Sequence, residues 1–550
     1  MRKAIFPAAL AMLLPLTACL QQDPAATGPA DCAAPCADSA HARSDAGYLS
    51  ILEGMGYDPA AIRVYEDGFA VEDDIFIPKS DLDKPRALGK SSQRLVNPVY
   101  ADKQAKITIA IHPSIKAWTR DVHQAINMWN SVHSGIYLTA VTGNAQITVA
   151  SDTASVLPSS RRNLSATTCG LAGFPSEGFP YAWVSINMDV GAIANDERER
   201  ISVITHEIGH AIGLAHTNST DGTLISGSPS SDGTSIMNGN YCSITDDNLS
   251  DWDRRALLTI YPKDTPMAGI RFKDGDARDD LVVWRPATGV WWIKKSFDNY
   301  VSSIGYQWGL QGDVAIPKSD FDGDGFTDLA TWRPATGNWA ILTSSSDYKT
   351  QLVYQWGQRG DIPMGGMDLD GDNKTDLVTW RWTDGKWKVR KSSTGYADYV
   401  EYAWGDFGDI PVPDTDLDHD GKDDIVVYRP SNLTFYYKAS ASGFAGTGTI
   451  GWGSVGDIPM SGTDYDGDGK DELILYRPIQ GEWQMALSTT GFGTVRAYHW
   501  GTFGAVPVPD TDLDRDGKKD IVVWKREDGN WVVLKSSSGF SLGVTYAWGQ

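Results

Sequence analysis

Residues 320–333 read DFDGDGFTDLATWR, a run of alternating carboxylates followed by β-forming residues. The pattern returns through the second half of the chain, and two aromatic series mark its period of 48 residues. Trp-Gly pairs begin at Trp308, Trp356, Trp404, Trp452, Trp500 and Trp548, and a second series runs Trp291, Trp339, Trp387, Phe435, Trp483 and Trp531. Such repeats are typical of a β-propeller or a related closed array. Six units fill residues 263–550, so the sequence predicts an all-β propeller of six 48-residue repeats.

Each unit carries carboxylates at loop positions 1, 3, 5 and 9. The five full sets are Asp320, Asp322, Asp324, Asp328; Asp368, Asp370, Asp372, Asp376; Asp416, Asp418, Asp420, Asp424; Asp464, Asp466, Asp468, Glu472; and Asp512, Asp514, Asp516, Asp520. In the first unit Phe272 replaces the leading Asp, and Asp274, Asp276 and Asp280 remain. Alternate residues of a curled loop point inward toward one hard cation, and this spacing follows the start of an EF-hand loop without its Glu at position 12.

Solvated acidic turns are the alternative to calcium sites, but five full copies at one spacing favour calcium. We therefore expect about five or six structural calcium ions, with the first site weak or absent. The units resemble the FG-GAP-like calcium repeats of integrin-type propellers.

The net charge of the chain is consistent with repeats that bind cations. Asp and Glu number 70 against 48 Lys and Arg, a formal net charge of −22. A chain this acidic is a poor nucleic-acid binder, because phosphate contacts need basic residues. The repeat carboxylates account for nearly all of this net charge, so their repulsion should loosen the array when calcium is removed.

Residues 206–216 read HEIGHAIGLAH and carry the chemistry. On a helix, His206 and His210 share one face and can bind one metal ion. Gly213 can end the helix and return the chain so that His216 becomes a third ligand. Three imidazoles leave one zinc position open, which is typical of a catalytic site, and Glu207 is placed to accept a proton from the water that zinc activates. Three solvated histidines on a surface helix are the alternative.

The HExxHxxGxxH string is the metzincin signature, and Ser235-Ile236-Met237-Asn238-Gly239 fits the Met-containing turn of that family. The HEIGH string, residues 51–82 and the segment from Cys169 to Asp189 resemble the bacterial dual-action HEIGH metallopeptidases. The resemblance covers about residues 46–262. It implies a secreted zinc endopeptidase of α+β fold, with His206, His210 and His216 as ligands, Glu207 as general base and Met237 beneath the metal.

Some features depart from the family or stay open. Some metzincins have a Tyr two residues after the Met, where this chain has Gly239, and Tyr241 is a weak substitute. Substrate is expected as an added strand on a sheet edge, for which 146–150 is the candidate. Arg161 and Arg162 are expected to be a solvated pair rather than part of the cleft.

The N-terminus indicates export. Arg2 and Lys3 precede an apolar run that is too short to span a bilayer, and Leu16-Thr17-Ala18-Cys19 resembles a lipobox with Cys19 as the lipidated residue. An ordinary secretory signal is the alternative. The four remaining cysteines allow disulfides outside the cytoplasm; Cys169 with Cys242 is the favoured pair because both flank the metal motif, and Cys32 with Cys36 would then close a local loop.

The expected organisation is a signal peptide over 1–19, a tether over 20–45, an N-terminal subdomain or prosegment over 46–104, a peptidase domain over 105–262 and the propeller over 263–550. Strands are expected at 106–111, 146–150 and 183–188, and helices at 118–132, 197–213 and 249–260, the last with Ser250 as N-cap.

Three hypotheses follow. The first is an exported, envelope-anchored or secreted zinc endopeptidase acting on protein or peptide substrates, with a propeller that could bind carbohydrate or a cell-surface ligand. The second is a surface adhesin whose protease only processes itself. The third, a zinc site used for folding, is weakened because the sequence shows no fourth protein ligand.

Overall fold

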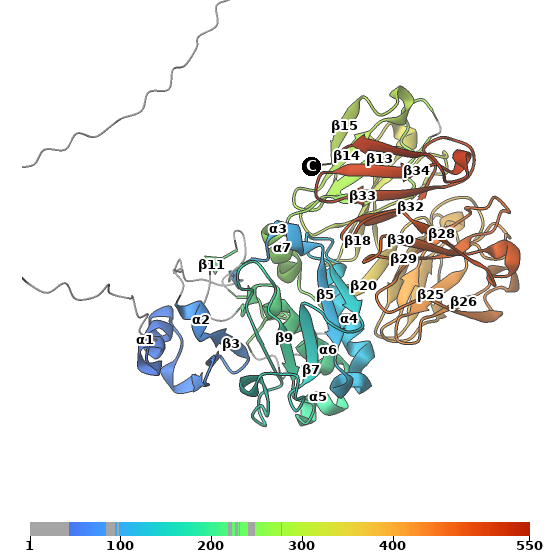
Figure 1. Ribbon diagram of the computed structural model, residues 1–550. Coiled ribbons are helices and arrows are strands. Elements are labelled where there is room, and N and C mark those ends of the chain that lie inside the picture. Colours follow the sequence, from blue (N-terminus) through green and yellow to red (C-terminus); the bar gives the residue numbers. More distant parts are fainter. Residues whose placement is uncertain are drawn as a thin grey trace, which may run out of the picture. The chain divides into compact units, whose positions relative to one another are not determined.

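A mixed sheet of eight strands is the framework of the N-terminal half in the computed structural model (Figure 1). Its strand order is β1-β2-β3-β8-β9-β7-β5-β6, and a three-stranded sheet in the order β10-β4-β11 accompanies it. The structure describes residues 43–83, 94–95, 98–217, 223–225, 229, 231–239, 242, 248–276 and 278–549.

The elements of this half have the following bounds. The helices are α1 Asp45–Met55, α2 Lys79–Leu82, α3 Ala101–Gln104, α4 Thr119–Asn130, α5 Gly191–Asn195, α6 Glu197–Ala211 and α7 Asp251–Ile260. The strands are β1 Arg63–Val64, β2 Gly68–Val71, β3 Ile75–Pro78, β4 Arg94–Leu95, β5 Ile107–Ile111, β6 Leu138–Val141, β7 Ile147–Ser151, β8 Gly170–Gly173, β9 Trp183–Ile186, β10 Leu214–Ala215 and β11 Thr223–Leu224.

Helices α4 and α6 pack against each other and fix the position of the metal motif. The buried face of α4 includes Val122, Ile126 and Trp129, as the three-to-four residue spacing predicts. The indole nitrogen of Trp129 donates a hydrogen bond to the backbone oxygen of Thr205 at 3.0 Å. The helix begins at Thr119 rather than at Trp118, because a 3-10 turn occupies Pro113–Trp118.

Helix α7 ends this half as the sequence predicts. Ser250 is its N-cap, and a capping box links the Ser250 side chain to Asp253. Asp253 is fully buried, and its carboxylate also accepts a hydrogen bond from the backbone N–H of Ile236. The start of α7 therefore holds the turn that contains Met237.

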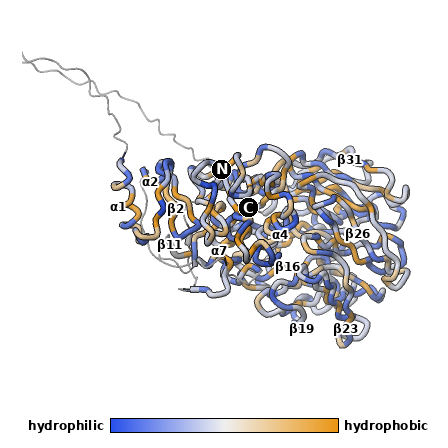
Figure 2. The backbone as a smooth tube through the Cα atoms, turned by 90° about the horizontal axis from the view of Figure 1, so that it is seen from below, coloured by the Kyte–Doolittle hydropathy of each residue, from blue (hydrophilic) through white to orange (hydrophobic). Residues whose placement is uncertain are grey.

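The N-terminal segment has a small core of its own. Figure 2 shows β2 as a hydrophobic stretch of the chain. The cluster is formed by Tyr48, Leu52, Tyr57, Phe69, Val71, Ile75, Ile77 and Leu82, joined by Phe174 and Ala215 from the peptidase region. Strand β3 extends the main sheet by pairing in parallel with β8, with Ile75 opposite Ala172 and Phe76 opposite Gly173.

The strand expected at 146–150 is present as β7, but it is not a sheet edge. It lies between β9 and β5, with both ladders parallel. The N-terminal segment instead pairs with β8. The sequence of β8 is Gly-Leu-Ala-Gly, and because glycine has a low β-strand propensity, the sequence did not indicate this strand. The prediction of the edge strand was therefore wrong.

The C-terminal half is a six-bladed β-propeller, as the 48-residue period predicts. Each blade is a four-stranded antiparallel sheet of strands consecutive in sequence. The strands are β12 Thr265–Met267, β13 Leu281–Arg285, β14 Val290–Lys294, β15 Ser303–Gln307; β16 Val314–Ile316, β17 Leu329–Arg333, β18 Asn338–Leu342, β19 Gln351–Gln355; β20 Asp361–Met364, β21 Leu377–Arg381, β22 Lys386–Arg390, β23 Tyr399–Ala403; β24 Ile410–Val412, β25 Ile425–Arg429, β26 Thr434–Lys438, β27 Thr447–Gly451; β28 Ile458–Thr463, β29 Glu472–Arg477, β30 Glu482–Ala486, β31 Val495–His499; and β32 Val506–Thr511, β33 Asp520–Lys525, β34 Asn530–Leu534, β35 Gly543–Ala547.

The two aromatic series meet in the blades, and the Trp-Gly series links four of the blades to the next one. Trp339 is fully buried, and its indole nitrogen donates to the backbone oxygen of Trp356 at 3.0 Å. Trp356 in turn donates to the backbone oxygen of Lys388 in the next blade at 3.3 Å. Trp308, Trp404 and Trp500 make the equivalent bond, whereas the indole nitrogens of Trp452 and Trp548 have no hydrogen-bond partner among the described residues.

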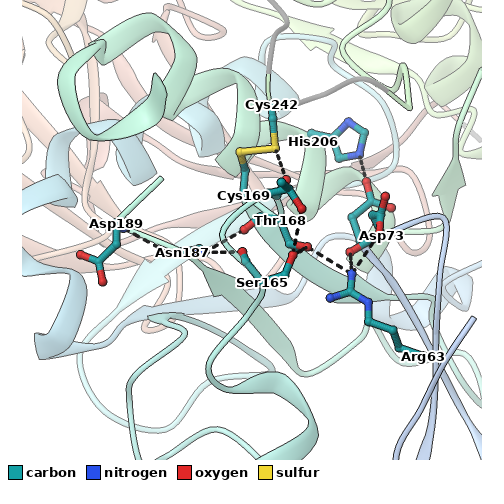
Figure 3. The surroundings of a disulfide bond; sticks show 11 residues. Arg63, Asp73, Ser165, Thr168, Cys169, Asn187, Asp189, His206 and Cys242 are labelled. Carbon is teal, nitrogen blue, oxygen red and sulfur yellow. Dashed lines mark hydrogen bonds and ion pairs between the residues drawn. A yellow bond between two sulfur atoms is a disulfide. The ribbon is translucent and has the colours of Figure 1, made fainter. Parts of the chain in front are cut away.

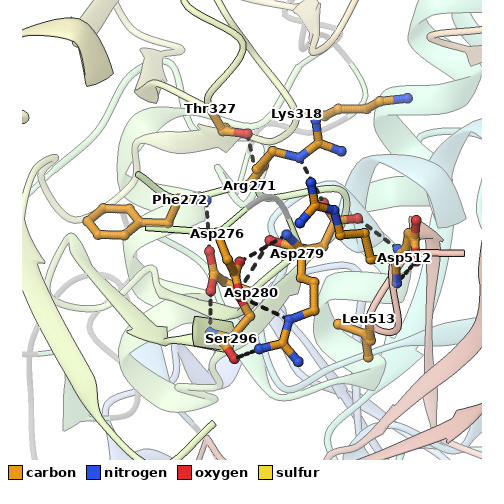
Figure 4. Close-up of polar contacts among 12 residues, drawn as sticks. Arg271, Phe272, Asp276, Asp279, Asp280, Ser296, Lys318, Thr327, Asp512 and Leu513 are labelled. Carbon is orange, nitrogen blue, oxygen red and sulfur yellow. Dashed lines mark hydrogen bonds and ion pairs between the residues drawn. The ribbon is translucent and has the colours of Figure 1, made fainter. Parts of the chain in front are cut away.

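The ring closes by contacts between the first and sixth blades (Figure 4). The backbone N–H of Asp512 donates to the Asp279 carboxylate at 2.8 Å, and the backbone N–H of Asp279 donates to the Asp512 backbone oxygen at 3.1 Å. The hydroxyl of Tyr300 reaches the backbone oxygen of Leu513 at 3.4 Å. The boundary is held by side chains and loop hydrogen bonds, because each four-stranded sheet belongs to one repeat.

No helix among the described residues has both the length and the apolar character needed to cross a bilayer.

Candidate metal centre

Helix α6 presents the first two histidines on one face. Asp196 caps the helix by accepting a hydrogen bond from the backbone N–H of Arg198 at 2.8 Å. Gly213 then adopts φ 107°, in the region that favours glycine, and β10 returns the chain so that His216 faces the helix. The Nε2 atom of His216 lies 3.1 Å from Nε2 of His206 and 3.2 Å from Nε2 of His210.

This spacing fits one zinc ion. Nitrogens about 2.0–2.1 Å from a tetrahedral ion lie about 3.3 Å from each other. All three side chains are buried. The structure therefore brings together the three histidines that the motif nominated, with their Nε2 atoms directed at one point.

The other nitrogen of each ring has its own partner. His206 Nδ1 donates to the backbone oxygen of Ile236 at 2.6 Å, and His210 Nδ1 donates to the backbone oxygen of Leu214 at 2.7 Å. His216 Nδ1 donates to the Glu72 carboxylate at 2.7 Å. Such partners fix the tautomer that leaves Nε2 free to bind a metal. The donor set thus fits a catalytic-type zinc site.

The N-terminal hairpin brings a carboxylate, Asp74, to the same point as the three histidines. Asp74 is fully buried, and its Oδ2 atom lies 3.1 Å from His206 Nε2, 2.9 Å from His216 Nε2 and 3.9 Å from His210 Nε2. These four side chains form a group that could hold a metal ion. The sequence showed no fourth protein ligand, and the structure adds Asp74 as a candidate. The sequence offered no signal for Asp74, because it lies 132 residues before His206 in an ordinary acidic turn.

The electrostatics of the cluster reflect burial and the Asp74 charge. Burial lowers the pKa of His206 to about 4 and also lowers the pKa of His210. Burial alone would lower the pKa of His216, but the Asp74 and Glu72 carboxylates raise it to about 10. Burial opposes ionisation of Asp74, yet the three imidazoles hold its pKa well below its usual range.

Glu207 lies on the same helix with its carboxylate buried. Burial first, and then the Asp74 charge, raise the pKa of Glu207 well above its usual range. The nearby backbone N–H of Ala172 opposes this rise, but neither carboxylate oxygen has a well-aligned hydrogen-bond partner among the described residues. The side chain packs on β8, where a Cβ atom added to Gly170 would lie 2.4 Å from Glu207 Oε1. A glycine at position 170 is what lets the carboxylate occupy this place.

The turn at 235–239 lies directly beneath α6. Met237 is 1% exposed, and a Cβ atom added to Gly209 would lie 2.4 Å from its sulfur. The glycine of the HEIGH string therefore makes room for the Met-containing turn. Tyr241 lies outside the described residues, so the structure does not test it.

A disulfide joins Cys169 to Cys242 (Figure 3). Cys169 immediately precedes β8, so the bond anchors the strand that supports Glu207. Asn187 strengthens the same corner by donating to the backbone oxygens of Ser165 and Thr168, each at 3.0 Å. Cys19, Cys32 and Cys36 lie outside the described residues.

Arg161 is not the solvated residue that the sequence suggested. It is 5% exposed, forms an ion pair with Asp67 and donates from Nε to the Tyr181 hydroxyl at 2.8 Å. Its guanidinium lies 3.3 Å from the ring centroid of Phe76. Arg162 is half-buried. Arg161 therefore fastens the N-terminal segment to the peptidase region.

The repeat carboxylates converge as sets of three. Loop positions 1, 3 and 9 form groups that could hold a cation, and they include Asp320, Asp322, Asp328; Asp368, Asp370, Asp376; Asp416, Asp418, Asp424; and Asp464, Asp466, Glu472. Position 5 is used differently: Asp324 accepts a hydrogen bond from the Ser344 hydroxyl at 2.7 Å. Exposed acidic groups are common without an ion, so these groups suggest calcium and no more.

In the first unit a basic side chain, Arg278, contacts the acidic loop. Arg278 Nε donates to Asp276 Oδ2 at 2.9 Å, and Phe272 stands where the other units have an Asp. Asp280 keeps its structural contacts, accepting hydrogen bonds from the backbone N–H groups of Phe272 and Ser296. The chain's own guanidinium therefore neutralises this loop.

Comparison with known proteins finds a family model that matches part of the chain. Residues 88–248 match the model of the dual-action HEIGH metallo-peptidase family, which supports a zinc metallopeptidase in this region. No curated protein matches the sequence.

Solved structures show weaker likenesses. A streptogramin B lyase is 12% identical, with 52% of this chain and 84% of that chain covered and a TM-score of 0.35. Virginiamycin B lyase from Staphylococcus aureus is 11% identical, with 52% and 88% covered and a TM-score of 0.33. Myroilysin is 15% identical, with 28% and 79% covered and a TM-score of 0.19.

Proposed function

We propose that the chain is an exported zinc-dependent endopeptidase of the metzincin type. The observation that carries the proposal is the convergence of the His206, His210 and His216 Nε2 atoms, with Glu207 buried on the same helix. The family match over residues 88–248 supports it. Met237 packed against Gly209 supports the metzincin type.

The chemistry is hydrolysis of a peptide bond. When bound, zinc supplies a Lewis acid that polarises the scissile carbonyl and makes water more acidic. Glu207 accepts a proton from the attacking water, whose oxygen bonds to the carbonyl carbon. The same carboxyl then gives the proton to the leaving nitrogen as the carbon–nitrogen bond breaks. Burial and the Asp74 charge raise the pKa of Glu207, which suits a group that first accepts a proton and then returns it.

The substrate is a protein or peptide in an extended conformation. Strand β8 is supported on one side by β9 and packs over Glu207, so a peptide paired with it would pass the histidine cluster. This makes β8, rather than β7, the proposed substrate strand.

The propeller is proposed to hold the peptidase near its substrate. Calcium at the groups formed by loop positions 1, 3 and 9 would neutralise the carboxylates and stabilise the loops between blades. A carbohydrate or cell-surface ligand is the proposed class of partner. The lipobox-like Leu16-Thr17-Ala18-Cys19 supports export and a lipid anchor at Cys19.

Casein hydrolysis tests the activity. The purified soluble chain is compared with Glu207→Ala, in zinc and calcium, with and without a chelator. Because Asp74 lies where substrate needs access, the comparison is repeated with Asp74→Ala in both chains. Cleavage that needs both zinc and Glu207 supports the proposal. Zinc-loaded Asp74→Ala protein that leaves casein intact would favour the adhesin hypothesis, in which the propeller is the functional module.

A further inference from the structure

The loop between β2 and β3 is built to place carboxylates in the metal centre. Glu72 and Asp73 have φ values of 51° and 74°, a region that glycine or asparagine adopts more easily. A glutamate has no conformational advantage at this position of the turn. Its carboxylate, however, accepts the Nδ1–H of His216 at 2.7 Å, and the next residues bring Asp74 Oδ2 to 2.9 Å from the same ring.

The residues around Asp74 also occupy the proposed substrate strand. The backbone N–H of Ala172 in β8 donates to the backbone oxygen of Asp74 at 3.0 Å. Ile75 and Phe76 continue the pairing opposite Ala172 and Gly173. A peptide substrate could not use these backbone groups of β8 while β3 holds them.

The segment that carries Asp74 is part of the main sheet, but it has a small core of its own and a defined set of contacts with the peptidase region. Most of its core belongs to residues 48–82, and Phe174 and Ala215 are the peptidase residues in that cluster. Arg161 holds Asp67 and stacks on Phe76, and the Ser176 hydroxyl donates to Asp81 at 2.7 Å. Arg63 reaches the Thr168 hydroxyl at 3.1 Å, next to the disulfide.

Four protein ligands could also mean a permanent structural zinc site. Glu207 argues against this. A structural site has no use for a buried carboxylate without a well-aligned hydrogen-bond partner, and such a group destabilises the fold. The arrangement fits a catalytic centre that is closed by its own chain.

We propose that residues 45–83 are an internal inhibitor, with Asp74 as the fourth zinc ligand and β3 as a strand that blocks β8. This inference rests on the zinc centre of the proposed function. The described state is then a latent form, and displacement of the hairpin opens the metal position and the substrate strand together.

Acetohydroxamate binding tests the inference without relying on catalysis, because this chelator needs open metal positions. Zinc-loaded full-length wild type, Asp74→Ala and Asp74→Asn are titrated by calorimetry, and zinc content is measured for each. If Asp74 closes the site in 99 of 100 molecules, Asp74→Ala binds the probe about 100-fold more tightly than wild type. Asp73→Asn is the matched control, since Asp73 lies in the same turn with its side chain 70% exposed, and it should bind as weakly as wild type.

Two results would overturn the inference. One is equal acetohydroxamate affinity in wild type and both Asp74 variants at equal zinc content. The other is loss of zinc from Asp74→Ala and Asp74→Asn, which would show a structural ligand. Limited trypsin digestion of wild type adds a test that needs no variant: release of the fragment containing residues 45–83, followed by mass spectrometry, should coincide with the gain in probe binding. Asp74→Ala protein that binds the probe but leaves casein intact would support the inhibitor and refute the endopeptidase.

Discussion

The contact between Gly170 and Glu207 leads to a specific prediction for Gly170→Ala. The new methyl carbon would lie 2.4 Å from Glu207 Oε1 and 2.7 Å from its Cδ and Cγ atoms, whereas ordinary contact begins at 3.4 Å. The carboxylate must therefore retreat by about 1 Å, and a displacement of that size costs on the order of 10²-fold in rate, or about 2.7 kcal/mol. Glu207 is fully buried, so it cannot relax into solvent.

The assay compares kcat/KM for a fluorogenic peptide, with all chains carrying Asp74→Ala so that the metal centre is open. Zinc content should stay unchanged, because Gly170 contacts the base and not a histidine. Gly191→Ala is the matched control, since a Cβ atom there meets nothing within 4 Å. If Gly170→Ala retains the parent's kcat/KM with full zinc content, the Glu207 position does not depend on this glycine and the reasoning fails.

Three further predictions concern the Arg161 contacts, the disulfide and the propeller. Arg161→Gln should lower the free energy of unfolding of the N-terminal segment by about 2 kcal/mol, a figure reduced because Asp67 is half-exposed. Trypsin should therefore release residues 45–83 faster from Arg161→Gln than from wild type. Equally fast release from the control variant Arg162→Gln would contradict this prediction. Replacing Cys169 and Cys242 by Ser should destabilise the peptidase domain by about 4 kcal/mol, since the bond spans 73 residues, and calorimetry should show the propeller transition unmoved. Burial raises the pKa of Asp328 to about 7, so the calcium-free folded form binds a proton between pH 7 and 4 that the unfolded chain does not. Its unfolding midpoint should therefore rise as pH falls through this window, while the increment from calcium, which needs the ionised carboxylate, shrinks; an increment independent of pH would exclude this carboxylate as a ligand.

The sequence was most informative where function or fold depends on regular spacing. The 48-residue period predicts the propeller because the blades repeat one packing arrangement, and five of the six repeat the hydrogen bond that Trp339 makes with Trp356. The histidine motif predicts the metal cluster because a helix and one glycine fix all three rings locally.

The features that sequence reasoning missed depend on contacts between distant segments. Asp74 belongs to a hairpin that only the folded sheet brings to the histidines. Arg161 is buried because Asp67 and Tyr181 surround it, and the residues next to it in the sequence do not indicate this burial. Strand β8 has two glycines, so its role at the centre of the site comes from space for Glu207 rather than from strand propensity.

The closure of the propeller has a mechanical consequence. The first and sixth blades meet through Asp279, Asp512 and neighbouring side chains, and each keeps all four of its own strands. A pulling force on the C-terminal end would act on the boundary between the first and sixth blades, where no ladder of backbone hydrogen bonds between strands has to be sheared. The sixth blade would peel away as a unit, and the remaining blades would follow one at a time, each rupture releasing the same 48-residue length of chain.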